Sequence, residues 1–146
     1  MVRSILSRIV IAMAVMAATA VSAAAEPDLT KADRTAIREV IEAQLDAFRA
    51  DDGVAAFSYA SPTIRKIFDN PIRFMTMVRT SYLPVYRPRE VEFQDVIDVR
   101  GAPTQLVLLV GPDNKVVTAF YEMQLQADGA WRINGCILRP LADRAI

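Results

Sequence analysis

The spacing of apolar residues changes once along this chain, and that change constrains the fold more than any other feature. Before Arg89, apolar side chains recur at steps of three and four residues, as in helices that are buried on one side. After Arg89 they alternate with polar side chains, as in strands with one solvent-exposed face. Short loops separate the alternating segments, so neighbouring strands must run antiparallel. The sequence therefore predicts an α+β domain with N-terminal helices followed by a four-stranded antiparallel sheet.

The first helical segment, Lys31–Asp51, is predicted to be the long helix of the domain. Its buried stripe consists of Ile37, Val40, Ile41, Leu45 and Phe48. Thr30 and Asp33 resemble a capping box at its start. Gly53 can adopt the left-handed conformation that ends a helix.

Three shorter helices are expected to follow. Polar residues that can cap a helix precede each of them, namely Asp52, Ser61 and Asn70. The predicted segments are Val54–Tyr59, Thr63–Phe68 and Ile72–Tyr82. Pro84 and Pro88 oppose further helix, so the segment between them is expected to be extended or turned.

The strand region begins after Arg89 and contains four alternating segments. Their predicted ranges are 90–99, Thr104–Val110, Val116–Gln126 and Ala130–Leu138. The apolar face of the first strand is formed by Val91, Phe93, Ile97 and Val99, and Asp95 falls on the same face. One long helix and a few short ones are most economically packed in the concave face of a curved four-stranded sheet. We expect a cone-shaped arrangement that is open at one end.

Residues 1–25 have the pattern of a secretory signal peptide. Two arginines precede the apolar run Ile9–Val21, and small residues precede Glu26. Cleavage after Ala23 or after Ala25 fits this pattern. The alternative is an uncleaved membrane anchor, because residues 9–25 reach the short limit for crossing a bilayer. Both interpretations place a single domain, residues 26–146, outside the cytoplasm.

The composition adds an expected compartment and excludes some partners. A chain with 14 arginines, 3 lysines and many alanines is typical of a bacterium with a GC-rich genome, so the periplasm is the predicted location. Without residues 1–25 the chain has 15 basic and 17 acidic side chains, a net charge of −2. This charge argues against nucleic acid as a partner. Stable membrane association is not expected once the signal is removed.

The chain contains no histidine, which limits the chemistry available to it. Histidine is the usual base for a serine or cysteine nucleophile and the commonest zinc ligand. The acidic pair Asp51 and Asp52 ends a helix, and Asp113 with Asn114 lies in a turn without the spacing of a calcium loop. A glycine-rich phosphate loop is also missing from the sequence. We therefore predict no metal and no cofactor.

Six polar residues are candidates for ligand binding: Gln44, Tyr82, Tyr86, Arg87, Arg132 and Asn134. Gln44 falls in the middle of the buried stripe, so its amide must find a partner in the backbone or line the interior of the cone. Tyr82, Tyr86 and Arg87 lie where the helices give way to the sheet, near the expected rim. Tyrosine hydroxyls with an arginine fork suit a carboxylate or another anion. In the structural alternative, Arg87 and Arg89 pair with Glu90 and Glu92.

Cys136 has no second cysteine with which to form an intramolecular disulfide. The two interpretations of its thiol are a small buried apolar group and a redox-sensitive group. Asp95 and Glu122 are the candidates for a catalytic carboxylate.

Several short stretches resemble known proteins. They are 44–48, 57–62, 82–88 and 131–136, and they resemble the bacterial family called domain of unknown function 4864 over nearly all of the domain. The order of elements and the closing hairpin, residues 128–133, are similar to the nuclear transport factor 2-like (cystatin-like) superfold. That resemblance implies a cone-shaped fold. It implies no activity, because the family has no established chemistry and the superfold serves enzymes, binders and scaffolds.

We therefore expect an exported, non-catalytic module that binds a small apolar or anionic ligand or takes part in protein assembly. The alternative is a small-molecule isomerase, dehydratase or hydrolase-type enzyme that uses the cone as its pocket. A third hypothesis is a homodimer that packs through the exposed sheet face, with Phe120 and Trp131 in the contact.

Overall fold

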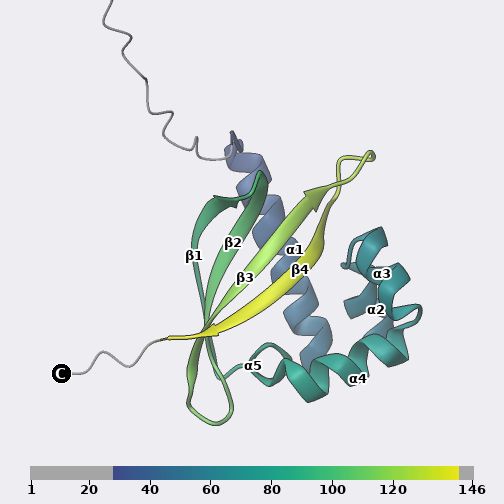
Figure 1. Cartoon of the computed structure of the whole chain (residues 1–146), viewed down its shortest axis with the longest axis vertical. Coiled ribbons are helices and arrows are strands. Elements are labelled where there is room, and N and C mark those ends of the chain that lie inside the picture. Colours follow the sequence, from purple (N-terminus) through teal and green to yellow (C-terminus); the bar gives the residue numbers. More distant parts are fainter. Residues whose placement is uncertain (1–27, 142–146) are drawn as a thin grey trace, which may run out of the picture.

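Five helices precede four strands in the computed structural model, which describes residues 28–141 (Figure 1). The helices are α1 (Lys31–Arg49), α2 (Gly53–Ser58), α3 (Pro62–Phe68), α4 (Pro71–Ser81) and α5 (Leu83–Tyr86). The strands are β1 (Glu90–Val99), β2 (Ala102–Val110), β3 (Val116–Leu125) and β4 (Trp131–Pro140). The predicted α+β class is confirmed. The predicted signal segment, residues 1–25, lies outside the described residues.

The start of α1 is stabilised by the predicted capping box. The Asp33 backbone N–H donates to Thr30 Oγ1 at 3.1 Å, and the Thr30 N–H donates to Asp33 Oδ2 at 3.0 Å. The prediction for the end of the helix was wrong, because Asp51, with φ of 52°, adopts the left-handed conformation. Aspartate tolerates this conformation through local hydrogen bonding. Gly53 instead opens α2, where a Cβ atom would come within 2.8 Å of Met75 Cγ.

The short helices begin at the predicted caps. The side chains of Asp52, Ser61 and Asn70 accept hydrogen bonds from the backbone N–H groups of Ala55, Ile64 and Arg73. The expectation of an extended or turned segment after Pro84 was wrong, since Leu83–Tyr86 forms one helical turn, α5. Proline is compatible with a first helical turn because its missing N–H has no partner there.

The four strands form a curved antiparallel sheet in the order β1-β2-β3-β4, and the helices pack in its concave face (Figure 1). The core lies between α1 and that face, where Val107, Leu109 and Ala119 are fully buried. Leu106 and Phe120, on the convex face, are only half-buried and lie outside this core. The described helices therefore cover one side of the sheet.

A bulge in β1 reverses the predicted alternation of that strand. The register shifts between Phe93 and Val96, so Gln94 and Asp95 share one position opposite β2. The buried residue beyond the bulge is Val96, whereas Ile97 was expected there, and Asp95 is exposed. An extra residue in one strand moves every later side chain to the other face.

A second bulge lies between β3 and β4 and shapes the region of the candidate site. Met123 pairs with Ile133, but Glu122 pairs with Gly135, so Asn134 is the extra residue. Beyond this point Cys136 pairs with Tyr121, and both face the helices. The bulge therefore turns Cys136 toward the interior.

Candidate functional site

A cavity of about 560 Å³ lies between the concave face of β3 and β4 and the helices α1, α3 and α4. Its wall is mostly apolar and includes the buried rings of Phe48 and Phe74. Ile67, which is 66% exposed, lies at its mouth. None of the residues that line the cavity carries a formal charge at neutral pH.

Gln44 lines this cavity and is buried in the middle of the α1 stripe, as the sequence predicted. Its Nε2 donates to the backbone carbonyl of Ala56 at 3.0 Å. Ala56 lies in the last turn of α2, where carbonyls have no partner within the helix. Gln44 therefore satisfies a helix end and also faces the cavity, so both interpretations of this residue apply.

Tyr82, at the junction of α4 and α5, also lines the cavity. Its hydroxyl donates to the backbone carbonyl of Cys136 at 3.0 Å. Burial raises the pKa of the Tyr82 phenol above its usual value. This contact connects the helical layer to β4 beside the second bulge.

Tyr121 and Cys136 line the same wall and were not among the predicted site residues. Burial raises the pKa of the Tyr121 phenol well above 10 and that of the Cys136 thiol to about 12. The nearby Cys136 thiol raises the Tyr121 pKa further. Among residues 28–141, the Tyr121 hydroxyl is the one fully covered side-chain oxygen or nitrogen that lacks a hydrogen-bond partner. The sequence feature that could have identified Tyr121 is a tyrosine on the apolar face of a strand. The hydroxyl of such a tyrosine needs a hydrogen-bond partner when it is buried.

The unpaired hydroxyl predicts a stabilising substitution. Burying a hydroxyl without a hydrogen bond costs about 1–3 kcal/mol, so Tyr121→Phe is expected to raise the free energy of unfolding of the unliganded protein by about 1 kcal/mol. Urea denaturation measures this change. Tyr82→Phe is the matched control and is expected to lower stability, because its hydroxyl is bonded. A loss in Tyr121→Phe as large as in the control contradicts the assignment.

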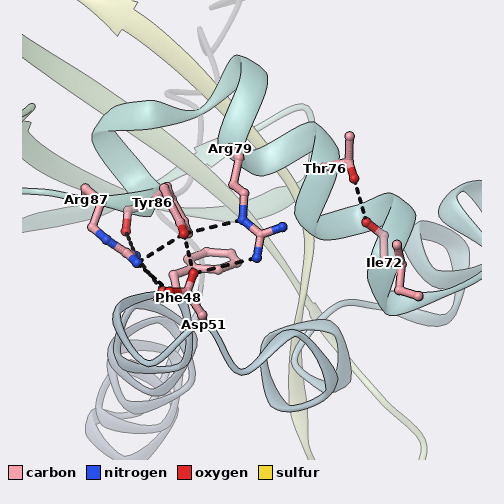
Figure 2. A network of polar contacts seen from close by, with 7 residues as sticks. All are labelled: Phe48, Asp51, Ile72, Thr76, Arg79, Tyr86 and Arg87. Carbon is pink, nitrogen blue, oxygen red and sulfur yellow. Dashed lines mark hydrogen bonds and ion pairs between the residues drawn. The ribbon is translucent and has the colours of Figure 1, made fainter.

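Tyr86 and Arg87 do not line the cavity but belong to a separate network at the end of α1 (Figure 2). Arg87 Nη2 donates to Asp51 Oδ2 at 2.9 Å, and Arg87 Nη1 donates to the Phe48 carbonyl at 2.6 Å. The Tyr86 hydroxyl donates to Asp51, and Arg79 lies 3.7 Å from the same carboxylate. The network connects the end of α1 to α4 and α5.

The predicted alternative partners of these arginines were wrong. Arg87 pairs with Asp51 rather than with Glu90 or Glu92, and Arg89 donates to Asn114. Asp51 is the better partner because the left-handed turn after α1 directs its carboxylate toward α5.

The Asp51 carboxylate gives this network a pH dependence. The hydrogen bond from Tyr86, followed by the charge of Arg87, lowers the pKa of Asp51 below 3.8. The pKa of Asp51 is lower in the folded protein than in the unfolded chain. The network therefore stabilises the fold fully above pH 3.8, and this stabilisation is lost as the pH falls through the pKa of the folded state.

We expect Asp51→Asn to reduce stability at pH 7 and to have little effect near pH 2. Asparagine keeps the left-handed turn, and Asp95→Asn, at an exposed position, is the control. An equal loss at both pH values contradicts this role.

Arg132 and Asn134 lie on β4 and do not line the cavity. Asn134 Nδ2 donates to Glu122 Oε1 at 2.6 Å, and its Oδ1 accepts from the Ser61 hydroxyl at 2.8 Å. Arg132 Nη1 donates to the Trp131 carbonyl at 2.9 Å. The six predicted residues thus separate: Gln44 and Tyr82 lie at the cavity, and the other four lie elsewhere.

No cluster of three or more acidic or cysteine side chains that could hold a metal ion occurs among the described residues. Within the same part of the chain, no helix is long and apolar enough to cross a membrane.

The fold and the cavity define a class of small α+β domains in which an antiparallel sheet curves around helices and leaves an apolar pocket between them. The family comparison is more specific. The family model described as "Domain of unknown function (DUF4864)" matches residues 30–146, and the chain belongs to this family. No curated protein and no solved structure matches the chain.

Proposed function

We propose that this protein is an exported, non-catalytic module that binds a small apolar ligand in its cavity. The observation that carries the proposal is an uncharged, mostly apolar cavity of about 560 Å³ that opens beside the exposed Ile67. Ligand sites commonly measure about 300–1,000 Å³ and combine apolar walls with a few polar groups. We further propose a nuclear transport factor 2-like cone and, from the signal pattern of residues 1–25, a periplasmic location.

The positions of the carboxylates favour binding over catalysis. A general base must lie within hydrogen-bond reach of its substrate. Asp95 is exposed at the β1 bulge, and Glu122 is held by Asn134, so neither candidate base lines the cavity. The isomerase, dehydratase or hydrolase alternative therefore lacks a positioned carboxylate in this pocket.

The test is titration of the purified protein with the fluorescent apolar probe N-phenyl-1-naphthylamine. We expect one binding site with a Kd on the order of micromolar, which is an affinity that a probe of this size can reach. Ile67→Asp is expected to weaken binding about tenfold, because a carboxylate at the mouth opposes an apolar ligand. The matched control is Ile72→Asp, since Ile72 is 79% exposed and does not line the cavity. Unchanged affinity in Ile67→Asp, or equal losses in both variants, contradicts the proposed site.

The convex sheet face supports a second candidate, assembly of two copies. Half-buried Leu106 and Phe120 lie on this face, and Phe120 is paired with exposed Ile137. Trp131 does not contribute as first expected, because it is 6% exposed and its Nε1 lies 3.3 Å from Asp33 Oδ1. Sedimentation at micromolar concentration should show a dimer that Phe120→Glu dissociates. A monomer under these conditions contradicts the assembly.

A further inference from the structure

The cavity offers polar groups but no charge, and this combination identifies the chemistry of the ligand more closely. Gln44, Ser81 and Tyr82 bring uncharged polar side chains to the wall. Arginine, lysine, aspartate and glutamate are absent from the lining. An anion in this cavity would lose its hydration without gaining a cation, which is costly.

The orientation of the Gln44 amide is fixed by its partner. The Ala56 carbonyl can only accept a hydrogen bond, so Nε2 must point toward it and Oε1 must point away. Within residues 28–141 no donor reaches Oε1. This oxygen is not among the fully covered unpaired atoms, so it retains contact surface beside the cavity that Gln44 lines. The cavity therefore presents an unpaired hydrogen-bond acceptor.

We infer that the ligand is a neutral amphiphile with an apolar body and a hydroxyl group that donates a hydrogen bond to Gln44 Oε1. This inference rests on the proposed binding function and narrows the ligand from a small apolar molecule to a neutral alcohol. The space suits roughly 15–20 non-hydrogen atoms, if each takes about the 30 Å³ that a water occupies in the liquid.

The ionisable groups at the wall agree with a neutral ligand. The pKa values of Tyr82, Tyr121 and Cys136 are all raised, mainly because burial opposes a negative charge. The same environment that keeps two phenols and a thiol protonated also disfavours a bound carboxylate.

The inference is tested by competition of three probes against N-phenyl-1-naphthylamine at pH 7. 1-Decanol and methyl nonyl ether have the same number of non-hydrogen atoms, but only the alcohol can donate a hydrogen bond. Decanoate supplies the anion. We expect 1-decanol to bind about three- to tenfold more tightly than the ether, which corresponds to one neutral hydrogen bond, and decanoate to bind most weakly.

Gln44→Met keeps the length of the side chain and removes the acceptor, so it should abolish the preference for the alcohol over the ether. Equal binding of alcohol and ether by the original protein, or tightest binding of decanoate, overturns the inference while the proposed function stands. The same holds if the preference survives in folded Gln44→Met. If this variant does not fold, the comparison of alcohol and ether in the original protein decides alone. Failure of the fluorescent probe and of all three competitors to bind overturns the proposed function and the inference together.

Discussion

Truncation of Phe48 to alanine is expected to lower the free energy of unfolding by about 3–5 kcal/mol, the usual cost of removing a buried aromatic ring. Phe48 is 1% exposed, and its ring centroid lies 6.1 Å from that of Phe74. The backbone cannot readily close the space that remains, because Arg87 holds the Phe48 carbonyl at 2.6 Å. The ring therefore supports both the end of α1 and the wall of the cavity.

Urea denaturation of Phe48→Ala measures this loss. Val54→Ala is the control, since Val54 is 73% exposed and surface substitutions usually change stability by less than about 0.5 kcal/mol. A loss below about 1 kcal/mol in Phe48→Ala would show that the end of α1 does not pack against the cavity wall as described.

Gln44→Leu is expected to lower the free energy of unfolding by about 1–3 kcal/mol, although it makes the core more apolar. The substitution leaves the Ala56 carbonyl unpaired at the buried end of α2. It should also weaken binding of 1-decanol more than binding of methyl nonyl ether, because Oε1 is lost from the cavity wall. Thermal unfolding and probe competition on the same preparation measure the two effects separately.

Glu42→Leu is the matched control for Gln44→Leu. Glu42 lies on the same helix and forms an exposed ion pair with Arg38, which contributes little to stability. If Gln44→Leu changes neither stability nor ligand preference, the amide has neither of the roles assigned to it. A change in stability alone limits Gln44 to its bond with α2.

The local features of the fold could be predicted from the sequence because neighbouring residues determine them. The N-caps at Thr30, Asp52, Ser61 and Asn70 depend on a side chain and a backbone N–H three residues away. The burial of Gln44 followed from its place in the α1 stripe. Periodicity and short loops were enough for the sheet order.

The bulges could not be predicted because they depend on the partner strand. A single extra residue in β1 buried Val96 and exposed Asp95, and another in β4 turned Cys136 toward the cavity. Alternation within one strand carries no information on where its register shifts.

The candidate site was predicted only in part. Gln44 and Tyr82 were placed at the cavity by helix position, but the roles of Tyr86 and Arg87 depended on Asp51, 35 and 36 residues away. Helical and strand periods assign faces, and they do not pair side chains over such separations. Tyr121 lies within the predicted strand Val116–Gln126, but its unpaired hydroxyl became apparent only from the packing around it.

The most direct test of the binding cavity is methyl NMR of the isoleucines during titration with N-phenyl-1-naphthylamine. We predict that the methyl signals of Ile64, Ile67 and Ile133, which line the cavity, shift together and saturate at one equivalent. The signals of Ile72 and Ile97, which do not line it, should stay in place. Shifts confined to Ile72 or Ile97, or no saturable shift at any isoleucine, would contradict the cavity as the ligand site.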